Sequence, residues 1–163
     1  MTRLLLLCCA LTACAPQPAA GGPPAASSAP RAIRPPEFRV TDVQVSGTPG
    51  APLIRVQLRV YNPNPFAVQL LPGAVQAALL GEVAGELTLP ATDLEPAAAS
   101  TVWLEGRPSG PGAAGWAALQ AGNPVPLRLE GRLELAVGAA RPVFGPYPFA
   151  QVLWPPADPI LQP

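Results

Sequence analysis

The sequence predicts an all-β fold: a small antiparallel β-sandwich of about seven strands with Greek-key connections, of the kind seen in fibronectin and immunoglobulin domains, plus one short helix. Three observations lead to this prediction. From Glu37 onward, apolar and polar residues alternate with a period of two, which is typical of half-buried strands. Glycine and proline residues separate the alternating segments into short lengths. Only residues 112–122 have a helical pattern, with Trp116 and Leu119 on the face expected to turn toward the core.

The alternation predicts which side of each strand is buried. It is clearest from Val125 to Val137, where the opposite face carries arginine and glutamate in turn. Such a face suits solvent and lateral ion pairs of about 0.2 to 1 kcal/mol each. The residues expected to face the core are Ile54, Val56, Leu58, Val60, Val75, Ala77, Leu79, Val83, Leu87, Leu89, Val102, Leu104, Val125, Leu127, Leu129, Leu133, Leu135 and Val137.

The first strand requires an irregularity. Phe38 and Val40 have one parity, whereas Val43 and Val45 have the other. One extra residue near Thr41 would let all four apolar side chains point inward. We therefore predict a β-bulge at this point.

The N-terminus has the features of an export signal. Arg3 precedes a short apolar run, which ends in the sequence Leu11-Thr12-Ala13-Cys14. This ending resembles the lipobox of bacterial lipoproteins, in which the cysteine becomes the new N-terminus and carries lipid. Several acyl chains anchor such a protein firmly, because each buried methylene contributes about 0.8 kcal/mol. The alternative is an ordinary cleaved signal with a chance cysteine, since a run of about ten apolar residues is too short for a transmembrane helix.

We therefore divide the chain into four parts. Residues 1–13 are the predicted signal peptide, residues 14–36 the lipidated cysteine and a disordered tether, residues 37–157 the β-sandwich domain, and residues 158–163 a tail. The tether is rich in proline and alanine and has too few large apolar side chains to offset the entropy of ordering. We expect the protein in the bacterial cell envelope, facing outside the cytoplasm. If there are two membranes, we expect the outer one, because alanine rather than aspartate follows the lipidated cysteine.

Composition argues against several classes of function. The chain has ten arginines, ten acidic residues, and neither histidine nor lysine. Near-neutral charge argues against nucleic acid binding, and the lack of histidine removes Ser-His and Cys-His pairs and imidazole metal ligands. We expect no enzyme activity, no catalytic residues, no metal and no cofactor, although spacing alone leaves a glycosidase-type carboxylate pair open. Cys8 and Cys9 lie in the predicted signal, so we expect no disulfide, and we expect a monomer.

The most distinctive motif is Asn62-Pro63-Asn64-Pro65-Phe66, which follows directly on a predicted strand. Each proline restricts φ and removes a ladder donor, and each preceding asparagine is pushed away from the helical conformation. The amide side chains can satisfy nearby backbone groups. The chain must therefore kink at the motif.

In its context this motif resembles that of the group 2 late embryogenesis abundant proteins, whose shared unit is the water stress and hypersensitive response (WHy) domain. The likeness continues through residues 81–85, the helix around Trp116 and the strands at 127–137 and 142–153, and it covers residues 37–155. It implies a small antiparallel β-sandwich with one helix and a non-catalytic domain associated with desiccation and other stress. The five motif residues are signature positions, for which we favour a structural role over ligand contact. The prolines of the last segment depart from the family pattern, so we expect that segment to pair only at a sheet edge.

Trp103 has two interpretations. Parity along the predicted strand places its side chain on the opposite face from those of Val102 and Leu104. Either Trp103 covers a second hydrophobic layer under the helix, which is the interpretation we favour, or it is exposed to a protein or lipid partner.

Two functions are consistent with these features. The first is a lipid-anchored protein whose domain protects membranes or neighbouring proteins during water loss. The second is an envelope binding or assembly module that presents a hydrophobic crevice or an exposed strand edge to a lipid or protein partner. In both, the N-terminal lipid makes the membrane a partner.

The anchor assignment predicts the outcome of detergent phase partitioning. The wild-type protein should enter the detergent phase and Cys14→Ser should stay in the aqueous phase, because only the former carries acyl chains. Cys9→Ser is the matched control and should partition like the wild type. Water-soluble behaviour of the wild type would contradict the assignment.

Overall fold

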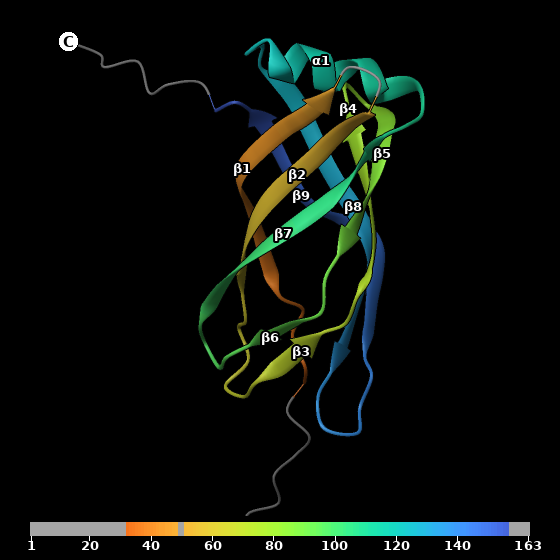
Figure 1. Ribbon diagram of the computed structural model, residues 1–163. Helices are drawn as coiled ribbons and strands as arrows, with labels where there is room; N and C mark the ends of the chain where they lie inside the picture. Colours follow the sequence, from red (N-terminus) through yellow and green to blue (C-terminus); the bar gives the residue numbers. More distant parts are fainter. Residues whose placement is uncertain (1–31, 49–50, 157–163) are drawn as a thin grey trace, which may run out of the picture. The chain divides into compact units, whose positions relative to one another are not determined.

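The computed structural model describes residues 32–48 and 51–156. The predicted signal peptide, Cys14, most of the tether and the tail lie outside the described residues. The described part forms nine strands, one 3-10 helix and one α-helix (Figure 1). In chain order these are β1 (Glu37–Thr48), β2 (Ala51–Tyr61), β3 (Val68–Leu70), β4 (Gly73–Leu79), β5 (Glu82–Leu89), β6 (Thr92–Leu94), β7 (Ala99–Pro108), η1 (Pro111–Ala113), α1 (Ala114–Gln120), β8 (Val125–Ala136) and β9 (Val143–Trp154).

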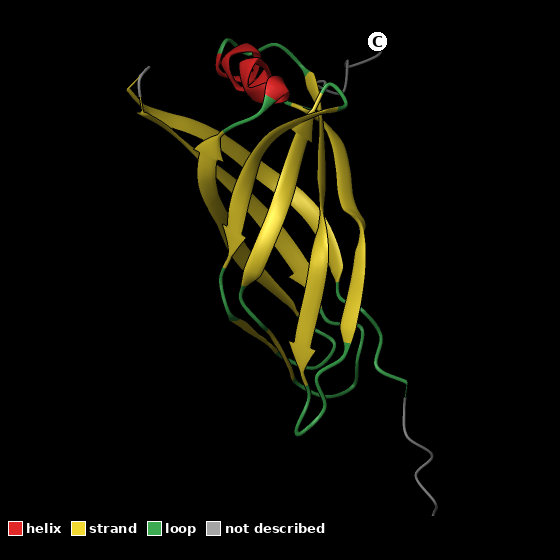
Figure 2. Cartoon of the chain, turned by 90° about the vertical axis from the view of Figure 1, so that its right-hand side faces the viewer, coloured by secondary structure: helices red, strands yellow, loops and turns green. Residues whose placement is uncertain are grey.

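The predicted all-β, sandwich-like fold is confirmed. Seven antiparallel strands hydrogen-bond side by side in the order β1-β2-β7-β5-β4-β8-β9, and β3 joins β6 to the second half of β8. β1, β2 and β7 lie in front, β8 and β9 lie behind them, and β5 and β4 connect these layers at one side (Figures 1 and 2). The described strands exceed the expected number by β3 and β6, whose three residues each are too few to show an alternating pattern.

One hydrophobic core lies between the layers, and the alternation identifies its members in β2, β4, β7 and β8. Full burial of one valine or leucine side chain stabilises the fold by about 1.5–3 kcal/mol. The prediction is wrong at Val83, which is exposed, whereas Ala84 is buried. A register shift opposite Ala77 and Ala78 turns the strand by one residue at this point.

The β-bulge predicted in β1 is confirmed. Val40 pairs with Leu58 and Asp42 with Gln57, so Thr41 has no partner in the ladder. The Thr41 hydroxyl lies 2.9 Å from the side-chain oxygen of Gln57, to which it donates a hydrogen bond. The bulge keeps the apolar side chains on both sides of it turned toward the core.

The predicted helix is confirmed at η1 and α1, which pack against β1, β5 and β8. Trp116 and Leu119 are buried, and the Trp116 indole N–H donates a 2.8 Å hydrogen bond to the Ala84 carbonyl. Gly115 permits the close approach, because a Cβ there would lie 2.8 Å from the Cβ of Leu79. No helix among the described residues is both long and apolar enough to cross a bilayer.

The last strand, β9, pairs only with β8 and forms one edge of the sheet. The expectation that the proline-rich segment pairs only at an edge is therefore confirmed. Pro146 and Pro148 lie in the first half of β9, and each lacks a backbone N–H, so this part of the strand is poorly suited to ladders on both sides.

The folded part begins earlier than the predicted boundary at Glu37. Residues 32–36, assigned above to the tether, lie against the domain: Ile33 packs on the core, Pro36 is buried, and the backbone of Arg34 is hydrogen-bonded to a side chain. The composition of residues 32–36 does not predict that they pack against the domain, because they are held by the side chain of Asn64, thirty residues farther along the chain. Residues 14–31 of the predicted tether lie outside the described residues.

The hairpin between β4 and β5 predicts a stabilising substitution. Its two-residue turn places Leu80 at φ 55° and Gly81 at φ 86°, the pattern for which Asn-Gly is preferred. Leu80 is 65% exposed, so Leu80→Asn loses little packing. We expect the variant to raise the free energy of unfolding in urea by about 0.5–1 kcal/mol.

Leu80→Ala is the matched control for that substitution. It shortens the same side chain, but alanine does not tolerate positive φ as asparagine does. Leu80→Ala should therefore change the free energy of unfolding less than Leu80→Asn does. If both variants changed the free energy of unfolding equally, relief of backbone strain at this turn would not be the cause of the stabilisation.

Candidate functional site

The signature motif lies where the chain leaves β2 and approaches β3, beside the end of β6. The Asn62 side chain is fully buried, with 0% exposure. The two N–H groups of its side-chain amide are shared among three backbone carbonyls, those of Phe66 (2.9 Å), Leu94 (3.2 Å) and Glu95 (3.0 Å). One side chain therefore joins the segments before β3 and after β6.

Asn64 extends this network to the N-terminal segment. The Asn62 side-chain oxygen accepts hydrogen bonds from the backbone N–H (3.0 Å) and the side-chain amide (2.9 Å) of Asn64. The Asn64 side chain also pairs with the backbone of Arg34, accepting from its N–H and donating to its carbonyl, both at 2.9 Å. A side-chain amide thus takes the place that a neighbouring strand would occupy for Arg34.

The other motif residues follow from this arrangement. Pro65 is exposed, Pro63 is partly exposed, and Phe66 packs against the edge of the core. The backbone carbonyl of Asn64 accepts a 3.0 Å hydrogen bond from the N–H of Ala97, which has φ 49°. The two amides are therefore turned inward and Pro65 outward, and the asparagine side chains bind the protein's own backbone.

Trp103 does not lie under the helix. It is on β7 in register with Gln57, half-buried on the outer face of the sheet. The Arg55 guanidinium lies 4.9 Å from the centre of the indole ring and donates a 2.8 Å hydrogen bond to Glu105. Because the pair is largely exposed, its contribution to stability is small.

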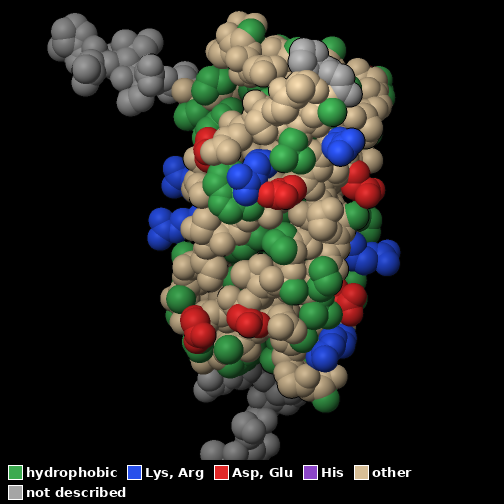
Figure 3. All heavy atoms as spheres, viewed as in Figure 1, with side chains coloured by type: hydrophobic (Ala, Val, Ile, Leu, Met, Phe, Trp, Pro, Cys, Tyr) green, Lys and Arg blue, Asp and Glu red, His purple; other side chains and the backbone are tan. Residues whose placement is uncertain are grey.

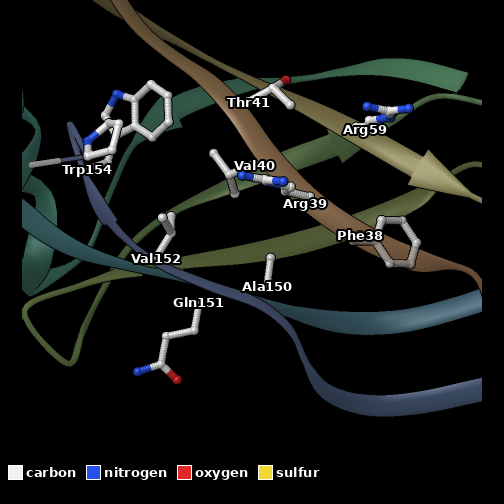
Figure 4. A pocket seen from close by; sticks show the side chains of 10 residues that line it. Phe38, Arg39, Val40, Thr41, Arg59, Ala150, Gln151, Val152 and Trp154 are labelled. Atoms are coloured by element: carbon white, nitrogen blue, oxygen red, sulfur yellow. The ribbon is translucent and has the colours of Figure 1, made fainter. Parts of the chain in front are cut away.

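A crevice runs between β1 and β9, the two edge strands of the main sheet. Its volume is about 500 Å³, within the range of small-molecule sites. Phe38 and Val40 from β1 and Ala150 and Val152 from β9 point into it, Gln151 points away, and Trp154 lies toward one end (Figure 4). Beyond Trp154 a second hollow of about 350 Å³ extends beneath the end of α1.

At the other end of the crevice from Trp154, Phe38 contacts Phe149. The rings of Phe38 and Phe149 lie 4.7 Å apart between their centres. Arg39 and Arg59 face each other across the β1–β2 ladder on the outer face of the sheet, opposite to Phe38 and Val40, and line the crevice from that side. Both are exposed, and neither forms an ion pair within residues 32–48 and 51–156.

The remaining charged groups are dispersed. Figure 3 shows acidic and basic side chains spread over one face of the molecule without a field of one sign. Glu86 and Glu130 flank Gln76 on the open sheet face, and Glu130 is paired with Arg128 at 2.6 Å. Burial raises the pKa of the Tyr147 phenol above its ordinary value of 10.0, so this group stays protonated near neutral pH. The part of the chain that the structure describes contains no cluster of three or more potential metal ligands.

The motif could be recognised in the sequence, but the crevice could not. Phe38 and Val40 were expected to face the core, whereas the opposite wall comes from β9, more than a hundred residues later. No local pattern could have shown that β1 and β9 lie face to face, and the opposition of Arg39 to Arg59 depends on the register set by the bulge.

Comparison with known proteins adds little to this geometry. No family model matches the chain, and no curated protein matches it. The chain is similar to a solved structure described as a protein from Archaeoglobus fulgidus, at 16% identity and a TM-score of 0.41, over 65% of this chain and 91% of that one. A TM-score of this size carries no argument about function.

The amide network predicts the effect of removing its centre. Asn62→Ala removes the side-chain donor of three backbone carbonyls and the acceptor of the Asn64 backbone N–H, and each unsatisfied buried group costs about 1–3 kcal/mol. We expect the free energy of unfolding in urea to fall by about 3 kcal/mol or more. Asn123→Ala is the matched control, because Asn123 is exposed and its side chain forms no hydrogen bond within the described residues. A similar, small loss in both variants would contradict a structural role of the motif.

Proposed function

We propose that this chain is a non-catalytic, membrane-anchored envelope lipoprotein whose WHy-like domain protects membranes or neighbouring proteins during water loss. The anchor is the lipid on Cys14, and the domain faces outside the cytoplasm. The Asn62–Phe66 motif acts as the structural centre of the domain rather than as a ligand contact.

The closed amide network is the observation that carries this proposal. Asn62 and Asn64 are 0% and 1% exposed, and their side-chain donors and acceptors bind each other and the backbone directly. Hydrogen bonds of this kind do not require a bridging water, so withdrawing solvent does not break them. A domain that acts while water is lost has to keep its own fold under the same conditions.

The surface is compatible with the same role. Charged side chains of both signs are dispersed, and the whole chain has ten basic and ten acidic residues. Interspersing the two signs avoids a large field of one sign, which would attract oppositely charged molecules non-specifically. The lipid anchor would hold the domain next to the membrane at the stage when bulk diffusion stops.

Drying and rehydration of vesicles tests the proposal. Dye-loaded vesicles carrying the wild-type lipoprotein should leak several-fold less than vesicles carrying an equal mass of an unrelated lipoprotein. Asn62→Ala should protect less because its fold is weakened, and Cys14→Ser should protect less because it is not held at the membrane. A dehydration-sensitive enzyme enclosed with the protein should retain more activity if the client is protein rather than lipid.

Three readouts together define the result that would contradict the proposal. Leakage and enzyme recovery equal to those with the unrelated lipoprotein, combined with unchanged survival of a deletion strain after drying, would exclude the protective function.

A further inference from the structure

Part of the gap between β1 and β9 is too narrow for an inserted strand. Some Cα atoms of the two strands lie within 8 Å of one another. A strand hydrogen-bonded to both edges would need them about 9.6 Å apart, twice the usual spacing between strands. The walls are apolar side chains, namely Phe38, Val40, Ala150 and Val152, with Trp154 farther along.

The charge at the crevice has one sign. The residues that line it include two arginines and no carboxylate. Arg39 and Arg59 are direct cross-strand neighbours, and like charges in that position repel each other. Glu37 lies near them, in an adjoining hollow, yet it forms no ion pair with either within the described residues. An anion between the two guanidinium groups would remove the repulsion and provide charge-assisted hydrogen bonds.

We propose that this crevice binds a single-chain anionic amphiphile, a long-chain fatty acid. The carboxylate lies at Arg39 and Arg59, and the acyl chain runs between β1 and β9 toward Trp154. The hollow on the far side of Trp154, lined by Val43, Val45 and Leu119 among others, receives the end of a longer chain. This binding goes beyond the protective function and does not depend on it.

Calorimetric titration of fatty acids into the full chain tests the proposal. The Cys14→Ser variant is used, so that the protein's own acyl chains do not compete. The probes are sodium decanoate, dodecanoate and tetradecanoate, each below its micellar concentration. We expect binding of one molecule per chain, with affinity rising about fourfold for each added methylene until the crevice is full.

Two sets of variants distinguish the contribution of the carboxylate to binding from that of the acyl chain. Arg39→Gln with Arg59→Gln should weaken tetradecanoate binding roughly tenfold and leave methyl tetradecanoate unaffected. Arg107→Gln with Arg132→Gln is the matched control, because it removes the same charge from exposed sites elsewhere and should change neither. Val152→Trp should fill the crevice and abolish binding of both probes, and thermal unfolding shows whether this variant is folded.

Each contrary outcome overturns the proposal. Binding that does not depend on chain length, or that survives in folded Val152→Trp, places the fatty acid elsewhere. Absence of binding both to the full chain and to a chain ending at Pro156 excludes the ligand, whereas binding to the shorter chain alone assigns the crevice to the protein's own tail. The vesicle-drying assay is a separate measurement, so failure here leaves the protective function untouched.

Discussion

The hydrogen bonds of the Asn62 and Asn64 side chains hold together segments of the chain that share no strand ladder. Asn62 connects the segment before β3 to the residues after β6, and Asn64 attaches the backbone of Arg34. Without them, several buried backbone groups would have no partner, and this end of the sandwich would have to admit water. The prolines between and after the two asparagines keep the chain extended and kinked, so that both amides face inward. The proposed stability during drying depends on this network being complete within the protein.

The way the sheet folds over explains the crevice. The ladder continues from β1 round to β9 without closing, since among the described strands β1 pairs only with β2 and β9 only with β8. Phe38 and Phe149 meet where the edges come close, and smaller side chains farther along leave space between the strands. An open edge is normally a liability in a β protein. Here it gives the domain an apolar recess with two arginines beside it, which the motif network alone would not provide.

Several features could be predicted from the sequence because they depend on local alternation. The inward residues of β2 and β8, the bulge at Thr41 and the helix around Trp116 follow from period and parity, which a core on one side imposes directly. Val83 could not be placed, because the bulge that exposes it is set by pairing with β4. Of the two interpretations of Trp103, the favoured one, beneath the helix, is wrong, since parity identifies the face of a strand but not what lies over that face. Residues 32–36 were assigned to the tether because their docking depends on an asparagine thirty residues away.

By itself, the sequence determined that this is an all-β protein with alternating buried faces, one short helix and a kink at the asparagine-proline motif. These properties depend on neighbouring residues, whose spacing decides which side chains share a face. Only the tertiary structure decided that the motif amides close one end of the fold, that β1 and β9 face each other, and that Arg39 and Arg59 are adjacent. Each of these depends on contacts between distant segments, and no local spacing encodes the path by which a curled sheet brings its two edges together.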